Sequence, residues 1–144
     1  MLVVMAIIAL VAGISFPAIS AGLDSVRLSS AANSVVSFLN TGVNRAERRQ
    51  QVMEVTISPR ENALWLRSTE PGYERKLELP EGVRIEEILP KLDEPEPGPR
   101  RFLLMPGGTA PRIGIQIANR RGAQRIVRVE PATGVPLVEV PGTP

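Results

Sequence analysis

The chain of 144 residues contains no cysteine and no histidine, and only 3% of its residues are aromatic. Without cysteine it can form no disulfide and has no thiolate nucleophile. Without histidine it lacks the commonest general base and the commonest zinc ligand. It also contains no G-x-S-x-G nucleophile motif. The sequence therefore predicts that the protein is not an enzyme and binds no metal and no cofactor, and that its core is aliphatic.

Charge is also missing from the beginning of the chain, where the first ionisable side chain is Asp24. A bilayer core about 30 Å thick is spanned by roughly 20 apolar residues in a helix. Residues 1–23 meet that requirement, and we expect them to form a transmembrane helix with a kink at Pro17. The side chains that would provide its apolar surface are Leu2, Val3, Val4, Ile7, Ile8, Leu10, Val11, Ile14 and Phe16.

Three other interpretations compete for this segment. A helix buried in a protein core would need apolar surroundings on all sides, which a chain of this length hardly provides. A cleaved signal peptide is favoured by the small residues between Ala18 and Ala21, but no Lys or Arg precedes the apolar run. An ordinary single-pass anchor satisfies the length rule equally well.

The residues after Asp24 favour a helix that continues beyond the membrane. One apolar stripe recurs at spacings of three and four, with serine and asparagine between its members. Arg48 and Arg49 follow, where cations suit the carboxyl end of a helix. We therefore expect residues 24–51 to form the amphipathic half of one uninterrupted helix, a sequel that a signal peptide does not need. The stripe consists of Leu28, Ala32, Val35, Leu39, Val43 and Ala46.

After the helix the apolar pattern changes to the alternation of β-strands. Turn signals such as Pro71-Gly72 and Pro80-Glu81-Gly82 separate short segments at regular intervals. The fold class predicted is α+β, a long N-terminal helix followed by a small antiparallel β-sheet or sandwich head over residues 52–144. Strands are expected over 52–57, 63–67, 73–79, 83–86, 101–105, 112–117, 124–129 and 135–140, the last at a sheet edge because of Pro136.

Charge is unevenly distributed in the head. Residues 54–99 carry a net charge of −5 and residues 100–129 a net charge of +7. Two adjacent, mutually neutralising segments would explain this, and a basic face for an acidic partner or nucleic acid is the alternative. Possible contacts with an anionic partner are Arg120, Arg121 and Arg125. The Pro-rich and acidic stretch 91–99 is a candidate contact loop, although a solvated connection is the simpler interpretation.

Residues 2–19, LVVMAIIALVAGISFPAI, resemble the N-terminal helix of type IV pilin-like proteins. The rest of the chain resembles the minor pseudopilins of the GspH/FimT type, in the stretches 79–83 and 126–129, in Phe102 with Pro106-Gly107-Gly108, and in Thr133-Gly134. The resemblance implies a pilin-like fold and a structural subunit of the periplasmic pseudopilus of a type II secretion system, which supports protein export across the outer membrane.

Further expectations follow from this resemblance. The protein would be a single-pass inner-membrane protein with its C-terminal head in the periplasm, and its partners would be other pseudopilins or minor pilins, membrane lipid and a secreted protein substrate. The apolar residues between Leu2 and Pro17 would pack in the filament. The resemblance also implies processing by a prepilin peptidase and methylation. The family's basic leader and its Glu would precede Met1, so we expect either a start codon assigned too late or a chain trimmed at its front.

Two alternative functions belong to other classes. A FimT-like minor type IV pilin would serve pilus assembly or DNA uptake. DNA-capturing relatives carry a basic G-R-x-R-like run after the late Thr-Gly, whereas here Gly134 is followed by Val135-Pro136-Leu137, which weighs against nucleic acid as a partner. A periplasmic binding protein with a signal peptide is the other, and the amphipathic continuation of the helix disfavours it.

Overall fold

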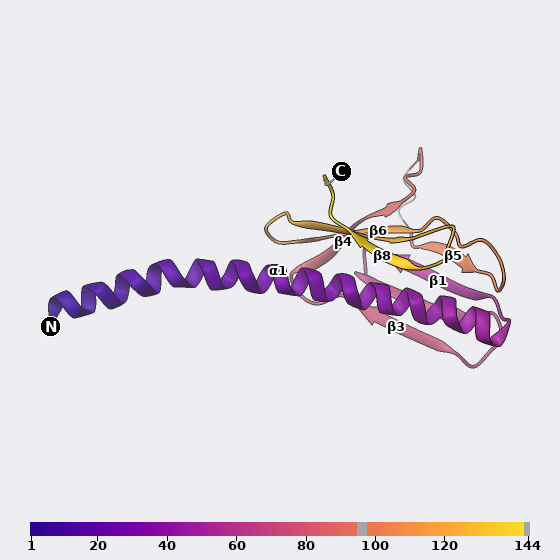
Figure 1. Ribbon diagram of the computed structural model, residues 1–144, viewed down its shortest axis with the longest axis horizontal. Coiled ribbons are helices and arrows are strands. Elements are labelled where there is room, and N and C mark those ends of the chain that lie inside the picture. Colours follow the sequence, from indigo (N-terminus) through magenta and orange to yellow (C-terminus); the bar gives the residue numbers. More distant parts are fainter. Residues whose placement is uncertain (95–97, 143–144) are drawn as a thin grey trace.

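A computed structural model describes residues 1–94 and 98–142 of the chain. The described residues form one long helix followed by eight strands (Figure 1). The elements are α1 (Leu2–Arg49), β1 (Met53–Ser58), β2 (Ala63–Ser68), β3 (Glu74–Glu78), β4 (Val83–Leu89), β5 (Arg100–Leu104), β6 (Gly114–Asn119), β7 (Gln124–Val129) and β8 (Pro136–Glu139).

Helix α1 runs through the first charged residue, Asp24, without a break. Its 48 residues give it a length of about 70 Å. Pro17 lies inside the helix and does not end it, and the first half of α1 is curved in Figure 1. The helix ends where Gln50 takes a left-handed conformation (φ 51°) and donates its backbone N–H to the carbonyl of Ala46. The expectation of one uninterrupted helix is confirmed.

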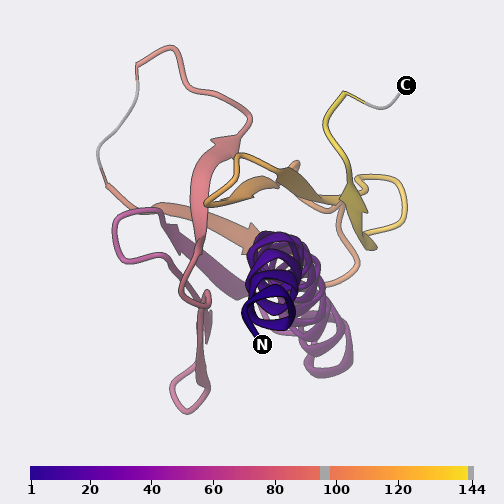
Figure 2. The ribbon, with the colours of Figure 1, turned by 90° about the vertical axis from the view of Figure 1, so that its left-hand side faces the viewer.

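The strands form two antiparallel four-stranded sheets. The first has the order β3-β2-β1-β5 and the second the order β4-β6-β7-β8. The carboxyl half of α1 packs against both sheets, and the view along the helix axis shows the strands gathered on one side of it (Figure 2). The antiparallel β head that the alternating sequence predicts is thus confirmed, and β8 is an edge strand as Pro136 indicates.

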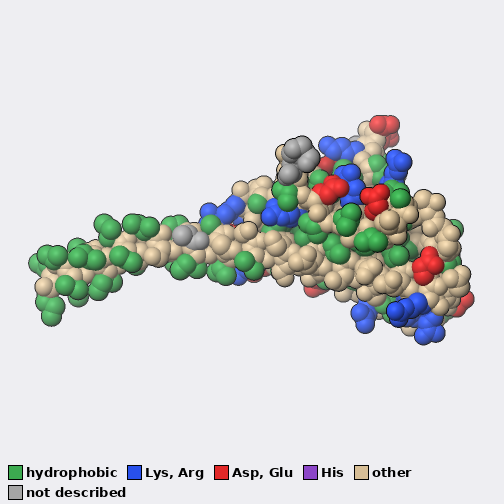
Figure 3. Space-filling model, in the orientation of Figure 1, with side chains coloured by type: hydrophobic (Ala, Val, Ile, Leu, Met, Phe, Trp, Pro, Cys, Tyr) green, Lys and Arg blue, Asp and Glu red, His purple; other side chains and the backbone are tan. Residues whose placement is uncertain are grey.

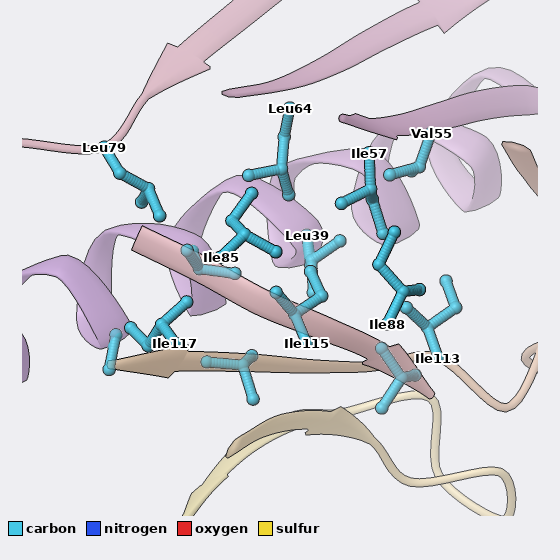
Figure 4. Close-up of a cluster of buried hydrophobic side chains, with 14 of the residues drawn as sticks. Leu39, Val55, Ile57, Leu64, Leu79, Ile85, Ile88, Ile113, Ile115 and Ile117 are labelled. Carbon is cyan, nitrogen blue, oxygen red and sulfur yellow. The ribbon is translucent and has the colours of Figure 1, made fainter. Parts of the chain in front are cut away.

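One aliphatic core joins the helix to both sheets. Leu39 of α1 lies between Ile57 and Leu64 of the first sheet and Ile115 of the second, all fully buried (Figure 4). Burying each such side chain contributes roughly 1.5–3 kcal/mol relative to leaving it in water. Val43 of the predicted stripe is only partly buried against this core, and Ala31, which was not predicted, is buried in it. The other stripe residues are buried as predicted: Leu28, Ala32, Val35, Leu39 and Ala46.

Two details of the second sheet differ from expectation. Strand β4 extends to Leu89, three residues beyond the predicted end, and a β-bulge at Glu86 shifts its register between Ile85 and Glu87. Ile85 and Ile88 both remain buried, so Glu86 and Glu87 both lie outside the core. A regular strand would place these two adjacent carboxylates on opposite faces, and the bulge instead leaves both outside the core.

The other boundaries lie close to the predicted ones, with β6 beginning two residues late. Ile113 is fully buried there but precedes the ladder, and its backbone N–H is bound by the carbonyl of Pro111. Residues 95–97 of the candidate contact loop and residues 143–144 of the chain end lie outside the described residues.

Candidate functional site

The most distinctive surface of the molecule is the bare first half of α1. We call residues 2–23 the projecting segment, because in Figure 1 it extends away from the β head. Its large apolar side chains are exposed, by 78% at Phe16 and still by 56% at Val11. Figure 3 shows this segment as an almost continuous apolar surface. Every apolar residue predicted for the membrane or filament helix is exposed here: Leu2, Val3, Val4, Ile7, Ile8, Leu10, Val11, Ile14 and Phe16.

An apolar surface of this extent marks an interaction site in a soluble protein or a segment that lies in lipid. The helix is long and apolar enough to cross a membrane by length and composition, and its most apolar window has no buried residue. Pro17 is exposed in the same segment and removes the hydrogen bond that the carbonyl of Gly13 would otherwise accept. In a membrane, neighbouring groups can satisfy such a carbonyl.

The change from the projecting segment to the packed half of α1 takes place between Asp24 and Leu28, the first fully buried residue of the helix. The turn between β6 and β7 binds the helix at this level. Arg121 donates from Nε to Asp24 Oδ2 at 3.0 Å, and Asn119 Nδ2 lies 3.5 Å from the Asp24 carbonyl oxygen. The buried Asn119 amide oxygen also accepts the backbone N–H groups of Arg121 and Ala123. This clamp fixes the turn against the helix.

The three arginines predicted as contacts for an anionic partner each have a different partner within the chain. Arg121 is paired with Asp24, and Arg120 lies 3.5 Å from Glu81. Arg125 donates to the backbone carbonyl of Gln124. Contact of these three residues with an anionic partner stays a prediction, and the two arginines of the turn already face carboxylates of the chain.

A groove of about 610 Å³ opens at the other end of the head, between α1 and the loops that follow β5 and β7. Among the described residues that line it, Glu47 alone is acidic or basic, and its Oε1 accepts the backbone N–H of Gly107 at 2.9 Å. No local sequence pattern indicates this groove, because three segments far apart in the sequence form it. Over residues 1–94 and 98–142 there is no cluster of three acidic, His or Cys side chains that could hold a metal.

No family model matches the chain, and no curated protein matches it significantly. Among solved structures, the chain is similar to the minor pseudopilin EpsH from the type 2 secretion system of Vibrio cholerae, with 17% sequence identity and a TM-score of 0.61. The match covers 81% of this chain and 99% of that chain.

This likeness shows the fold. The chain has the pilin-like α+β architecture of a minor pseudopilin, with one long N-terminal helix and a small antiparallel β head. The fold class expected from the sequence is confirmed, and so is the expected likeness to GspH-type pilins, as a likeness of fold.

Proposed function

We propose that this chain is a minor pseudopilin, a structural subunit of the periplasmic pseudopilus of a type II secretion system that supports protein export across the outer membrane. One observation carries the proposal. A single helix is bare and apolar over its first half and is part of the core of the β head over its second half. The likeness to the pseudopilin EpsH supports it.

The physical mechanism is an exchange of one apolar environment for another. In the membrane, the projecting segment would contact lipid, with the head in the periplasm. In the filament, the same side chains would contact the helices of other pseudopilins. Because lipid tails are as apolar as leucine, packing between helices rather than a hydrophobic force drives this association. The protein would thus act by assembly, with other pseudopilins, inner-membrane lipid and a secreted protein as partners, and without catalysis or cofactor.

Membrane fractionation tests the role of the projecting segment. We expect the full chain to remain in the membrane pellet after carbonate extraction. The double variant Ile7→Asp with Val11→Asp should become extractable, because each aspartate costs about 2.5–3.5 kcal/mol near the centre of a membrane helix. The matched control, Asn33→Asp with Ser37→Asp, places the same charges at the same spacing on the exposed polar face and should stay in the pellet. Extraction of the unaltered chain would contradict the proposal.

Disruption of the gene separates the two assembly systems. We expect type II substrates to accumulate in the periplasm and secretion to return with the full-length gene and its upstream in-frame sequence. Normal secretion combined with loss of pili or of DNA uptake would instead assign the chain to the minor type IV pilins. The same upstream sequence tests whether a leader that ends in G-F-T-x-x-E precedes Met1.

A further inference from the structure

We propose that the end of the head nearest the projecting segment binds the phosphate groups of anionic phospholipids, through a hollow lined by Arg84 and Arg120. This inference rests on the proposed placement of the projecting segment in a bilayer, and it names a lipid class that this placement alone does not require. Three features support it: the level of the β6–β7 turn relative to the bilayer, the residues that line the hollow, and the charges around the hollow.

The contact between Arg121 and Asp24 fixes the level of the β6–β7 turn relative to the bilayer. Residues 2–23 give about 33 Å of helix at 1.5 Å per residue, close to the hydrocarbon thickness of about 30 Å. Asp24 is the first ionisable side chain after this apolar run, so we place it at the membrane boundary when the segment spans the bilayer. Since the guanidinium of Arg121 is 3.0 Å from the Asp24 carboxylate, the β6–β7 turn lies at the same level. That level is the headgroup layer, which is about 6–8 Å thick on each side.

The hollow lies beside this clamp. It has a volume of about 430 Å³, and its lining, over the part of the chain that the structure describes, includes Arg84 of β4 and Arg120 of the turn but no acidic residue. The Arg120 side chain crosses Gly82, where a Cβ would come within 3.3 Å of its Nε. The lining residues are Gly82, Val83, Arg84, Asn119, Arg120 and Gly122. Two arginines thus line one hollow, and arginine binds phosphate in a bidentate manner.

The carboxylates near this end hold the two arginines only weakly. Arg84 is 74% exposed at its side chain and 3.4 Å from Glu86, and Arg120 is 62% exposed and 3.5 Å from Glu81. Exposed pairs of this kind contribute about 0–1 kcal/mol, so a phosphate can replace the carboxylate at little cost.

Arg27 adds a third cation one helical turn above Asp24. It is exposed, and in the described part of the chain no carboxylate lies within salt-bridge distance of it. Figure 3 shows Lys and Arg side chains where the projecting segment meets the head. Basic side chains beside a membrane helix are attracted to anionic lipid surfaces.

The test uses the full chain in vesicles of phosphatidylcholine and phosphatidylglycerol, and phosphorus NMR to resolve the two lipid phosphates. Because the chain has no cysteine, Ala123→Cys gives a single nitroxide site in the turn. We expect this label to broaden the phosphatidylglycerol resonance several-fold more than the phosphatidylcholine resonance, after correction for composition. A label at Ala132→Cys, in the turn beside Val43 and about 28 Å further along the helix, should broaden neither.

Two further measurements decide the assignment. The variant Arg84→Gln with Arg120→Gln should lose the preference for phosphatidylglycerol, whereas the matched variant Arg48→Gln with Arg49→Gln, at the far end of α1, should keep it. The preference of the unaltered protein should also fall in 1 M salt, where the Debye length is about 3 Å. Equal broadening of both lipids, or an unchanged preference in the Arg84/Arg120 variant, would overturn the inference. Failure of the chain to insert, seen by carbonate extraction, would instead count against the proposed function.

Discussion

The side-chain amide of Asn62 lies 2.7 Å from the carbonyl oxygen of Val83 and joins the two sheets of the head. Its Nδ2 donates to Val83, and its Oδ1 accepts the backbone N–H of Ile85 at 2.8 Å. Asn62 follows β1 in the first sheet, whereas Val83 and Ile85 belong to β4 of the second. The residue has φ 53°, a left-handed conformation that asparagine tolerates better than most residues. One side chain thus satisfies two backbone groups across the inter-sheet boundary.

We predict that Asn62→Ala lowers the free energy of unfolding by about 2–4 kcal/mol, because two backbone groups lose their partners and alanine is strained at positive φ. Asn62→Gly removes the same hydrogen bonds without that strain and should cost about 1–3 kcal/mol. Thermal and denaturant unfolding of the full chain in detergent measures both. Unchanged stability of the glycine variant would show that the amide does not hold the sheets together.

Gly42 lies where α1 comes close to the first sheet. A Cβ at this position would lie 2.8 Å from Leu66 Cδ1 and 2.9 Å from Leu104 Cδ1, and both leucines are buried. We expect Gly42→Val to destabilise the head by about 1–3 kcal/mol through overpacking.

Gly42→Ala should be milder, because alanine gains about 1 kcal/mol of helix propensity over glycine. Gly22→Ala is the matched control, since no atom lies within 4 Å of its added Cβ. It should leave the unfolding of the head unchanged. An equal change in the free energy of unfolding of the head in Gly22→Val and Gly42→Val would contradict this account of the packing.

The exposed pair of Lys76 and Glu78 predicts a small pH dependence. Lys76 Nζ lies 2.7 Å from Glu78 Oε1, and its hydrogen bond and charge hold the pKa of Glu78 below the usual 4.5. The same hydrogen bond raises the pKa of Lys76 above 10.5. The stabilisation from Glu78 is therefore present above its unfolded pKa and is lost as the pH falls through the lowered value. That from Lys76 is lost as the pH rises through the raised value.

Carbon NMR titration of the Glu78 carboxyl measures this interaction directly. We expect Lys76→Met to return the pKa of Glu78 towards 4.5. The neighbouring change Arg75→Met is the control, because successive side chains of a strand point to opposite faces. A Glu78 pKa that does not respond to the Lys76 change would show that the pair does not persist in solution.

The side chains of Asp24 and Arg121 should show a measurable coupling free energy. The Asp24 side chain is 17% exposed and that of Arg121 is 48% exposed, so the pair is only partly screened by water. A double-mutant cycle with Asp24→Asn and Arg121→Gln should give a coupling of about 0.5–1 kcal/mol. The pair of Arg128 and Glu139 has a 3.8 Å separation and roughly half-exposed side chains, and it is the control with an expected coupling near zero. Equal coupling in the two cycles would contradict the role of the clamp.

Local sequence patterns were sufficient to predict the helix and most strands. The spacing of Leu28, Val35 and Leu39 places them on one face, and all three are fully buried. The alternation of Ile113, Ile115 and Ile117 likewise predicts the inner face of β6 at Ile115 and Ile117, and Ile113, just before the strand, is buried as well. These patterns succeed because the core is aliphatic and continuous, so burial follows the period of each element.

Relations between distant segments could not be predicted in this way. The pairing of β5 with β1 and of β4 with β6 divides the strands between two sheets, and no turn signal specifies that division. The bulge at Glu86 was missed because one extra residue leaves no compositional trace. The Asp24–Arg121 contact joins residues 97 positions apart, and either residue had several possible partners of opposite charge.

The explanation of the charge asymmetry was correct only in part. Strands of the acidic and basic segments are adjacent, as expected, in the pairs β1–β5 and β4–β6. Among the ion pairs of the described residues, however, only Arg120–Glu81 joins the two segments directly. Several carboxylates instead bind cations of their own segment, as Glu74 binds Arg67 and Glu87 binds Lys91. Adjacent strands therefore bring the opposite charges close without pairing them one to one.

The unbroken course of α1 past Asp24 makes the head and the projecting segment rotate as a single body. Each residue of an α-helix turns the chain by about 100°. Suppose that, in a filament, the projecting segment shifted along its axis by one residue and kept the same kind of contacts with its neighbours. The head would then turn by about 100°, which is more than a quarter of a revolution. The axial position of the projecting segment in a filament would then determine which face of the β head points outward.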